Sequence, residues 1–373
     1  MLLSVIIVSY KVPHYLQLCL ESVQRALSAI ESEIIVVDNA SEDSTLEILS
    51  SKFPKVKCIA NKVNVGFSKA NNQGVEAASG KYVCILNPDT LLPENCFKDA
   101  LAFVDTVNDL GILGVRLVDG TGNFLPESKR NLPTLRVSLA KLVGNTRTYY
   151  ADHLSETGIG KVAILVGAFM FMKRSVYSEV GGFDERFFMY GEDIDLSYEV
   201  TKMGYANYYL GTVSVIHFKG ESTIKDRQYA SRFYGAMRLF SQKHFYKSVW
   251  IDRLFNLGVN ILKLTYSSKE MEVENGFGYE TLYWISDHTD IPNSLRTKGV
   301  SLNWKEFSEI SKDNLHSCRF IFDLEGSSIK LVIEMIQQLK NRQNTFRIRP
   351  SNCNFICGGD SANRRSQAEN HND

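Results

Sequence analysis

The sequence predicts an α/β fold in which helices cover both faces of a mostly parallel sheet. In the first half of the chain, short β-branched runs alternate with amphipathic helical stretches, which is the pattern of successive βαβ units. The early runs are continuously apolar, as expected for strands that are buried on both faces. The chain has 373 residues, of which 44% are hydrophobic, so a large core is expected. At roughly 150 residues per domain, this length suggests about two domains.

Composition excludes several classes of protein. The 42 Lys and Arg residues balance 42 Asp and Glu residues, whereas proteins that bind bulk nucleic acid usually carry a basic surplus. No apolar run approaches the roughly 18–20 residues that span a bilayer, and the start MLLSVIIVSY lacks the features of a signal peptide. The seven cysteines are scattered, without a CxxC pair, which favours reduced thiols and a cytoplasmic location.

Strands are predicted where a short apolar or β-branched run is bounded by turn residues. In the first hundred residues these runs are 4–9 (SVIIVS), 34–37 (IIVV), 55–60 and 82–86. Later runs that fit the same pattern are 162–172, 212–216, 319–323, 345–348 and 355–357.

Helices are predicted between these strands. After Pro13, apolar residues recur on one helical face, at Leu16, Cys19, Leu20, Val23, Leu27 and Ile30. Ser44 and Glu47 form a predicted capping box for a second helix, and Pro93 fits the first turn of another. Further helical patterns cover residues 68–78, 192–203, 225–263 and 328–340.

These elements suggest a division into residues 1–224, a basic aromatic helical segment over 225–265, and a small α/β accessory domain over 266–373. The stretch 119–160 is rich in Gly, Pro and Thr and is expected to be a mobile insertion. The segment 225–265 combines many Lys and Arg residues with aromatic residues. It fits either peripheral contact with an anionic membrane surface or a solvated face packed on the main domain, and both alternatives remain open.

Polar residues end the predicted parallel strands, and ligands of such sheets bind beyond the carboxyl ends of the strands. Ser9, Asp38, Asn87 and Asp89 should therefore converge on one edge. The first strand is not followed by GxGxxG, and the chain contains no GxxxxGK[ST], so a metal is the simplest way to handle nucleotide phosphates. Asp89 of the Asn87-Pro88-Asp89 triplet could bind Mg²⁺ or Mn²⁺, although such a triplet also occurs as a plain turn.

A second polar group follows in the stretch GGFDERFFMYGEDIDL. Glu192, Asp193 and Asp195 crowd the first turn of a predicted helix, where acids are also favoured by the helix dipole. Repulsion among them would raise one pKa and leave a usable general base. His217 ends a later strand beside a glycine turn, where it fits either a metal ligand or a structural histidine.

The ordered motifs SVIIVSY, IIVVDNASEDST, NKVNVGFSKANNQG, ILNPDT, GGFDERFFMYGEDIDL and VIHFKGES resemble those of family 2 glycosyltransferases, which have the GT-A fold. Within that family, the chain is most similar to the rhamnosyltransferase-like branch of bacterial surface-polysaccharide enzymes. The resemblance extends from residue 1 to about residue 245. One departure is Glu199, where relatives often carry arginine.

The resemblance implies a set of site residues. The nucleotide sugar would be bound by Ser9, Tyr10, Asp38, Asn64, Gly66, Asn72 and Asn87. The divalent metal, Mg²⁺ or Mn²⁺, would be held by Asp89 and His217. Asp193 would be the catalytic base, within an acidic turn that also contains Glu192 and Asp195.

The sequence therefore predicts an inverting glycosyltransferase. It would move a sugar from a nucleotide-diphospho sugar to a hydroxyl of a lipid-linked or nascent surface glycan. The expected location is the cytoplasm, with peripheral contact at the inner face of the cell membrane, and no nucleic-acid partner is expected. Two alternatives are a catalytically dead nucleotide- or glycan-binding module and a sugar nucleotidyltransferase, although the chain lacks a glycine-rich phosphate loop after its first strand.

Overall fold

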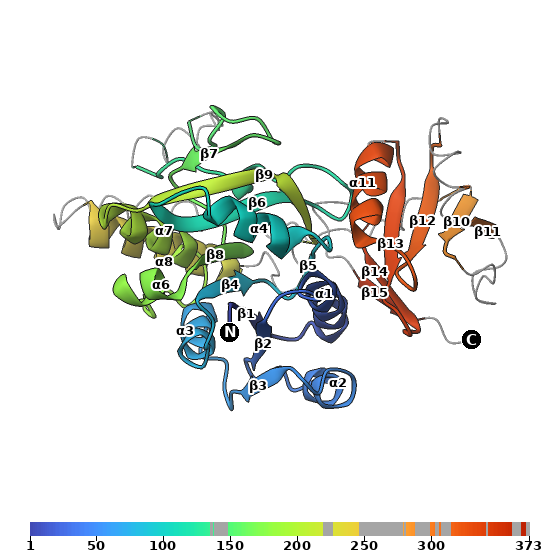
Figure 1. Ribbon diagram of the computed structural model, residues 1–373, viewed down its shortest axis with the longest axis horizontal. Coiled ribbons are helices and arrows are strands. Elements are labelled where there is room, and N and C mark those ends of the chain that lie inside the picture. The colour runs from blue at the N-terminus through green and yellow to red at the C-terminus, as the bar shows by residue number, and fades with distance from the viewer. Residues whose placement is uncertain are drawn as a thin grey trace.

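The chain forms two β-sheets with associated helices, one of nine strands and one of six (Figure 1). The computed structural model describes residues 1–134, 137, 148–218, 227–245, 279, 281–287, 299–302, 306, 315–340, 342–359 and 367–370. Within these residues, no helix is both long enough and apolar enough to cross a bilayer.

The nine-stranded sheet has the order β3-β2-β1-β4-β8-β6-β9-β5, with β7 paired to β9. Four neighbouring strands are parallel: β1 (Leu3–Ser9), β2 (Ser32–Asp38), β3 (Lys57–Ala60) and β4 (Tyr82–Leu86). A second parallel pair is β6 (Leu110–Val118) and β9 (Ala206–His217). The antiparallel strands are β5 (Thr90–Leu91), β7 (Ile159–Val162) and β8 (Phe169–Lys173).

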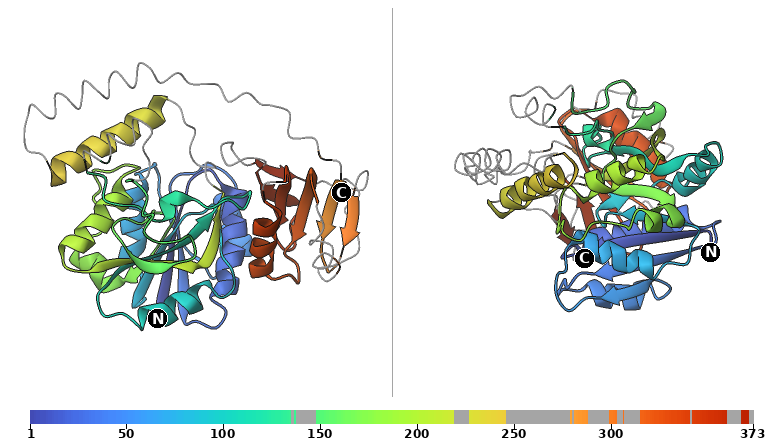
Figure 2. Two further views of the ribbon diagram at one scale, coloured as in Figure 1. Left: turned by 90° about the horizontal axis from the view of Figure 1, so that it is seen from above. Right: turned by 90° about the vertical axis from the view of Figure 1, so that its left-hand side faces the viewer.

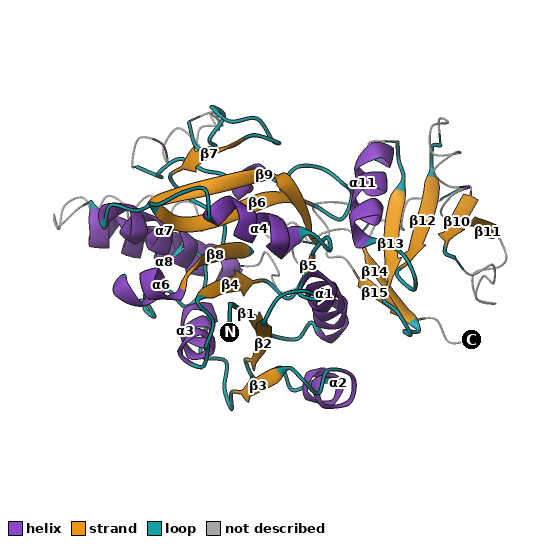
Figure 3. Ribbon diagram, viewed as in Figure 1, coloured by secondary structure: helices purple, strands orange, loops and turns teal. Residues whose placement is uncertain are grey.

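Helices cover both faces of this sheet, as the sequence predicted (Figure 3). One face packs against α1 (Pro13–Ala26), α2 (Thr45–Lys52) and α4 (Cys96–Val104). The other face packs against α3 (Phe67–Glu76), α6 (Arg174–Glu179) and α7 (Glu192–Lys202). A short 3-10 helix, η1, spans Pro126–Ser128, and α8 (Arg227–His244) lies at the end of the molecule far from the second sheet (Figure 2).

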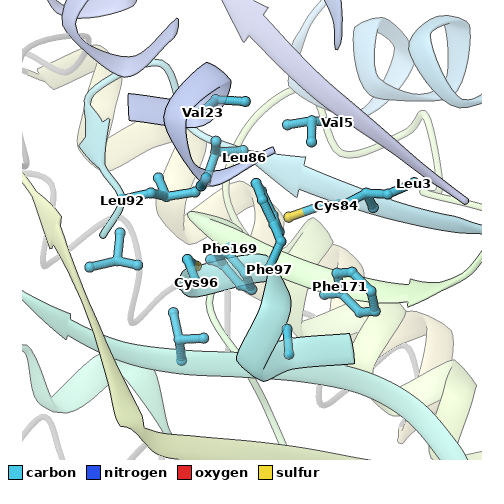
Figure 4. Close-up of a cluster of buried hydrophobic side chains, with 14 of the residues drawn as sticks. Leu3, Val5, Val23, Cys84, Leu86, Leu92, Cys96, Phe97, Phe169 and Phe171 are labelled. Carbon is cyan, nitrogen blue, oxygen red and sulfur yellow. The ribbon is translucent and has the colours of Figure 1, made fainter. Parts of the chain in front are cut away.

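The main core lies between the first face of the sheet and α1 and α4 (Figure 4). Phe97 of α4 stacks on Phe169 of β8, with ring centroids 6.2 Å apart. Both rings are almost fully buried. This apolar contact fixes the sheet under the edge at which its parallel strands end.

The six-stranded sheet has the order β11-β10-β12-β13-β14-β15. Its strands are β10 (Thr281–Ile285), β11 (Gly299–Leu302), β12 (Cys318–Asp323), β13 (Thr345–Arg349), β14 (Phe355–Gly358) and β15 (Gln367–Asn370). The first four are parallel, and the last two are antiparallel additions. One face is covered by α11 (Ile329–Leu339).

The two sheets share one hydrophobic cluster, which we call the inter-sheet cluster. From the large sheet and α1 it contains Val12, Tyr15, Leu18, Leu91, Val118, Ile216 and Phe218. From the second sheet and α11 its largest members are Phe320, Phe322, Phe346 and Phe355. Polar contacts flank it: the carboxylate of Glu94 accepts from the Ile329 amide at the start of α11 at 2.6 Å.

One long predicted strand, residues 162–172, is wrong. The structure has two strands there, β7 and β8, and they pair with different neighbours. Between them, the Leu165 amide donates to Ser197 Oγ at 3.3 Å, and the Gly167 amide donates to Asp193 Oδ2 at 3.2 Å. Ile164, in the same run, exchanges backbone hydrogen bonds with Arg130. The backbone between β7 and β8 is therefore satisfied by side chains and by one isolated bridge instead of a continuous strand ladder, which periodicity cannot reveal.

Smaller predictions also differ. Ser44 makes no side-chain cap, and Asp43 instead accepts from the Thr45 amide at 2.9 Å. The first helix ends at Ala26, before Ile30, and the fourth begins at Cys96, after Pro93. Strands β5, β6, β10, β11 and β15 were not predicted. The later part of the predicted helical segment, residues 246–265, lies outside the described residues.

The described part of the predicted mobile insertion, 119–160, is well packed. Lys129 and Arg130 are 4% and 7% exposed. Lys129 Nζ donates to the Ala151 carbonyl at 2.9 Å, and the Arg130 amide donates to the Ile164 carbonyl at 2.9 Å. The composition suggested mobility, but these bonds tie the stretch to the sheet.

Candidate functional site

The ends of β1 and β2 bring the first two predicted residues together. Ser9 lies opposite Asp38 in the parallel register, and both are buried. Ser9 Oγ and Asp38 Oδ1 have no hydrogen-bond partner in the part of the chain that the structure describes, although Asp38 Oδ2 accepts from the Ser41 amide at 3.3 Å. Buried polar atoms are rarely left unpaired. This pair therefore forms a polar edge with unused hydrogen-bonding capacity, and Tyr10 follows it, partly exposed.

The loop that leads into α3 is folded against this edge by an asparagine that the sequence analysis did not single out. Asn39 donates through Nδ2 to Asn64 Oδ1 at 2.9 Å, and its own Oδ1 accepts from the Val65 amide at 3.0 Å. Asn64 Oδ1 also accepts from the Gly66 amide at 3.0 Å. Asn64 and Gly66 therefore lie beside the end of β2, next to Asp38.

Gly66 is required by its backbone conformation and by its neighbour. Its φ is +90°, a conformation that favours glycine. A Cβ at this position would lie 2.7 Å from the carbonyl oxygen of Phe188, which accepts from the Phe67 amide at 2.7 Å. The start of α3 and the 187–191 segment are thus held in direct contact.

Replacing Gly66 with alanine should destabilise the protein by about 1–3 kcal/mol, because the new Cβ meets both backbone strain and the Phe188 carbonyl. Urea unfolding of the variant and the wild type would measure the loss. The matched control is Gly235→Ala, because a Cβ there meets nothing within 4 Å and an exposed helical alanine should be neutral or stabilising. Equal stability of Gly66→Ala and wild type would contradict the expectation.

Asn72 is placed differently from the other predicted nucleotide-site residues. Its Nδ2 donates to the Phe183 carbonyl at 2.9 Å and to Glu185 at 3.1 Å. Its Oδ1 accepts from the Tyr177 hydroxyl at 2.5 Å and from the Phe183 amide at 3.0 Å. The Asn72 side chain thus holds the turn that contains Gly181 and Gly182 in place, and its amide group forms its hydrogen bonds with other residues of the protein.

The pairing of β5 with β9 brings Asn87, Asp89 and His217 together. Thr90 lies opposite His217, and the Phe218 amide donates to the Asp89 carbonyl at 3.0 Å. His217 Nε2 is 3.3 Å from Asp89 Oδ1 and 3.3 Å from Asn87 Nδ2. Among the described residues, no hydrogen-bond partner is found for the buried atoms Asp89 Oδ1, Asn87 Oδ1 and His217 Nδ1.

This group fits a divalent cation. Two adjacent ligands of an octahedral ion lie about 3 Å apart when each bond is about 2.1 Å, and the Asp89–His217 separation of 3.3 Å is close to that value. Carboxylate oxygen suits Mg²⁺ and Mn²⁺, and imidazole is a ligand for transition metals. The two protein ligands leave other positions for a ligand's oxygen atoms.

The acidic turn before α7 holds an ion pair. Gly191, with φ +80°, precedes the helix. Asp193 Oδ2 accepts from Arg130 Nη2 at 2.6 Å and from the Gly167 amide at 3.2 Å. Arg130 is buried, which by itself lowers its pKa, but the charges of Asp193 and Tyr149 and the hydrogen bonds to them together raise the pKa of the guanidinium above its ordinary value. No spacing in the sequence connects Arg130 with Asp193, so this partner was missed.

Glu192 is the protonated member of the acidic turn near neutral pH. Burial raises its pKa, and the neighbouring charge of Asp193 raises it further. Its Oε2 is buried, and no described residue forms a hydrogen bond with it. The sequence predicts one raised pKa in this turn. It is the pKa of Glu192 that is raised, while the carboxylate of Asp193 is paired with Arg130.

Asp195 is directed elsewhere. Residues two apart on a helix lie on different faces, and Asp195 contacts Lys243 Nζ at 2.8 Å and His244 Nε2 at 2.7 Å on α8. The side chains of Asp195, Glu199 and His244 offer ligand atoms within 4.8 Å of one another. The Lys243 ammonium, also 3.4 Å from Glu199, already balances this charge.

The contacts between α7 and α8 involve Glu199 and the beginning of the predicted basic segment over 225–265. Glu199, the departure from the expected arginine, pairs with Lys202 at 3.0 Å as well as with Lys243. The last basic residues of α8 are thus turned toward α7. Membrane contact through residues 225–265 stays a prediction, because most of that segment lies outside the described residues.

Comparison with known proteins gives related sequences. Residues 4–181 match the family described as "Glycosyl transferase family 2". The chain is 27% identical over 241 residues to N-acetylglucosaminyl-diphospho-decaprenol L-rhamnosyltransferase of Mycobacterium tuberculosis, which covers 60% of this chain and 78% of that protein. It is 29% identical over 167 residues to poly(ribitol-phosphate) beta-N-acetylglucosaminyltransferase TarS of Staphylococcus aureus, which covers 43% of this chain and 28% of TarS.

The solved structures to which the chain is similar include two in complex with nucleotide sugars. The mannosyltransferase PcManGT from Pyrobaculum calidifontis, in complex with GDP-Man and Mn²⁺, has a TM-score of 0.47 and 16% identity and covers 69% of each chain. S. aureus TarS 1-349 in complex with UDP-GlcNAc has a TM-score of 0.46 and 19% identity, covering 72% of this chain and 74% of that one.

Proposed function

We propose that this enzyme, whose residues 4–181 match glycosyltransferase family 2, transfers a sugar from a nucleotide-diphospho sugar with inversion at the anomeric carbon. The acceptor is a hydroxyl of a lipid-linked or polymeric surface glycan. The α/β architecture of this protein is the one predicted from the motifs, a GT-A fold with a mostly parallel sheet. The related M. tuberculosis and S. aureus enzymes, by their names, use such acceptors.

One observation carries the proposal: six of the predicted site residues each hold a buried polar atom that lacks a hydrogen bond among the described residues. Among the described residues, 15 buried side-chain atoms have no partner, and six belong to Ser9, Asp38, Asn87, Asp89, Glu192 and His217. Leaving a buried donor or acceptor unpaired costs about 1–3 kcal/mol each. A bound nucleotide sugar and cation would supply partners, so the site is preorganised for a polar ligand at this cost.

Asp193 is the proton acceptor in this proposal. The Arg130 guanidinium and the Gly167 amide hold one carboxylate oxygen in place, and the group carries negative charge while Glu192 retains its proton. The acceptor hydroxyl gives its proton to Asp193 as its oxygen bonds to the anomeric carbon. The bond to the diphosphate breaks on the opposite face, so one displacement inverts that carbon.

Asp89 and His217 would hold the divalent metal, which when bound neutralises the charge of the departing diphosphate. Ser9 and Asp38 would bind the base and ribose, because they lie at the end of the neighbouring strands with free polar atoms. Asn64 and Gly66 would line the same pocket through the loop that Asn39 organises. Asn72 would act through this architecture, by fixing the turn that precedes the acidic residues.

The metal and nucleotide site is tested by thermal unfolding with UDP, GDP and dTDP, each with Mn²⁺ or with EDTA. A ligand at about 100 times its dissociation constant adds roughly 2.7 kcal/mol of stability. We expect one nucleotide to raise the melting temperature only with Mn²⁺, and Asp89→Asn to remove that rise. The matched control Asp109→Asn replaces an exposed carboxylate paired with Lys161 and should keep it. A metal-independent shift in both variants would contradict the site.

The two alternative functions predict different reaction products when the same purified protein is assayed. A nucleotidyltransferase would turn over a sugar 1-phosphate with a nucleoside triphosphate, whereas a glycosyltransferase releases a nucleoside diphosphate from its donor. A catalytically dead binding module would show the thermal shift without either product. Release of the diphosphate in the presence of acceptor would exclude both alternatives.

A further inference from the structure

The segments that carry Asp89 and His217 are packed against the second sheet. Leu91 of β5, Ile216 of β9 and Phe218, which follows His217, all belong to the inter-sheet cluster. Figure 1 shows β5 and the adjacent end of β9 on the side of the large sheet that faces α11 and β14. The proposed metal ligands therefore stand on two short segments whose apolar side chains are buried in this cluster.

Tyr15 of α1 connects the second sheet to Phe218. Its ring meets the Phe218 ring edge-on, with centroids 5.1 Å apart. Its hydroxyl donates to the Gly358 carbonyl at 3.4 Å and accepts from the Gly358 amide at 3.2 Å. Tyr15 is 2% exposed, so these contacts are desolvated. A continuous path of contacts thus runs from the end of β14 through Tyr15 and Phe218 to His217.

Gly358 makes this path possible. A Cβ there would collide with the Phe346 carbonyl oxygen on the neighbouring strand, so the position is restricted to glycine. The Tyr15 hydroxyl can therefore bond to the Gly358 backbone with no side chain in between. The adjacent Gly359 amide lies 3.8 Å from where a Cβ of Gly120 would stand, and the same Cβ would lie 3.1 Å from the Phe218 ring. The end of β14 therefore lies close to Gly120 and, through Gly120 and Tyr15, close to Phe218.

His217 needs such support because its ring lacks a second hydrogen bond. Metal-binding histidines usually donate the other ring nitrogen to a carboxylate, carbonyl or water, which fixes the ring. Among the described residues, no partner contacts His217 Nδ1. The ring is instead positioned by the Thr90–His217 strand pairing, the bond from the Phe218 amide to Asp89, and the packing of Phe218.

We propose that the second sheet is a brace for the metal site: through Gly358, Tyr15 and Phe218 it holds Asp89 and His217 in the arrangement that binds a divalent cation. This inference rests on the proposed function. Tyr15 is a positioning residue, because it touches neither proposed ligand and acts through Phe218.

The experiment measures Mn²⁺ affinity of the full chain, by the electron paramagnetic resonance signal of free Mn²⁺, without any turnover. Tyr15→Leu removes the ring and the hydroxyl and should weaken Mn²⁺ binding about tenfold, at the low end of the effect of outer-shell partners. Tyr15→Phe keeps the ring against Phe218 and should lie between Tyr15→Leu and wild type. Circular dichroism at the same temperature verifies that each variant is folded.

Arg25→Ala is the matched control, because it weakens the same interface at a distance from the metal site. Arg25 donates to the Ser327 carbonyl at 2.7 Å and to the Leu324 carbonyl at 2.6 Å. It lies ten residues along α1 from Tyr15, about 15 Å. We expect Arg25→Ala to lower the melting temperature and to leave Mn²⁺ affinity within about twofold of wild type.

The outcomes separate this inference from the proposed function. If the wild type binds Mn²⁺ and Tyr15→Leu binds it equally well, the brace is wrong and the metal site stands. If Arg25→Ala weakens Mn²⁺ binding as much as Tyr15→Leu, the effect is a general loss of interface stability, and the specific path through Tyr15 is wrong. If the wild type itself binds no Mn²⁺, with or without nucleotide, the metal site falls and the brace falls with it.

Discussion

Replacing Asp193 with asparagine should lower kcat about a thousandfold, the middle of the range for loss of a general base. That factor corresponds to about 4 kcal/mol of transition-state stabilisation. An asparagine keeps the size and the Gly167 contact but cannot accept the hydroxyl proton. Transfer of a radiolabelled sugar gives kcat, and the Mn²⁺-dependent thermal shift with the nucleotide, measured on the same preparation, verifies that the donor site survives.

The variant also removes the charge partner of buried Arg130, so stability must be measured separately. Loss of one partner of a buried ion pair typically costs about 3–5 kcal/mol. A purely structural role for Asp193 predicts a lower melting temperature with normal kcat per folded molecule. Asp109→Asn, the exposed carboxylate described above, should turn over at the wild-type rate. Turnover of folded Asp193→Asn near the wild-type rate would falsify the base assignment.

Replacing Glu192 with glutamine should stabilise the protein by about 3 kcal/mol at pH 7. Burial and the charge of Asp193 raise the pKa of Glu192 to about 8, whereas the unfolded chain titrates near its ordinary value of about 4.3. Between these values, the unfolded chain has lost a proton that the folded chain retains. Wild-type stability therefore falls as pH rises from about 4.3 to about 8, and glutamine removes that loss.

The signature is a pH-dependent difference between the two proteins. Urea unfolding at a series of pH values should give similar stabilities below about pH 4, a growing advantage of Glu192→Gln toward pH 8, and a constant difference above it. Glu325→Gln is the matched control, because its carboxylate is 38% exposed and should shift stability little at any pH. A difference that does not change with pH would mean that Glu192 titrates normally in the folded protein.

Much of the large sheet follows from local pattern. The continuous apolar runs before Ser9, Asp38 and Asn87 can be buried only as central strands, so the convergence of these residues on one edge was predictable. The structure confirms it for Ser9 and Asp38 by their register. The prediction of one strand over 162–172 was wrong because the apolar residues would be buried in one long strand and in two short strands alike. Only the backbone hydrogen bonds distinguish these two arrangements.

The missing parts of the site depend on long-range contacts. Arg130 lies 63 positions before Asp193, in a stretch whose composition suggests a loop, and its role exists only because the fold brings the two together. Asn39 was visible as a turn residue but not as the organiser of the 61–66 loop. For Asp195, the sequence suggested a contact that the structure does not have. It was grouped with Asp193 because the two are close in sequence, whereas the helix directs its side chain toward Lys243.

Because the two sheets share the inter-sheet cluster, we expect them to have evolved together. Tyr15 and Phe218, from the large-sheet side, belong to the same buried cluster as Phe320 and Phe346 of the second sheet, and well-packed aromatic side chains tolerate few changes in volume. A recombination event that joined a different C-terminal sheet to this enzyme would leave those rings mismatched. Substitutions on the two sides should therefore co-vary among descendants, and the C-terminal sheet should pass between genomes together with the catalytic domain that it fits.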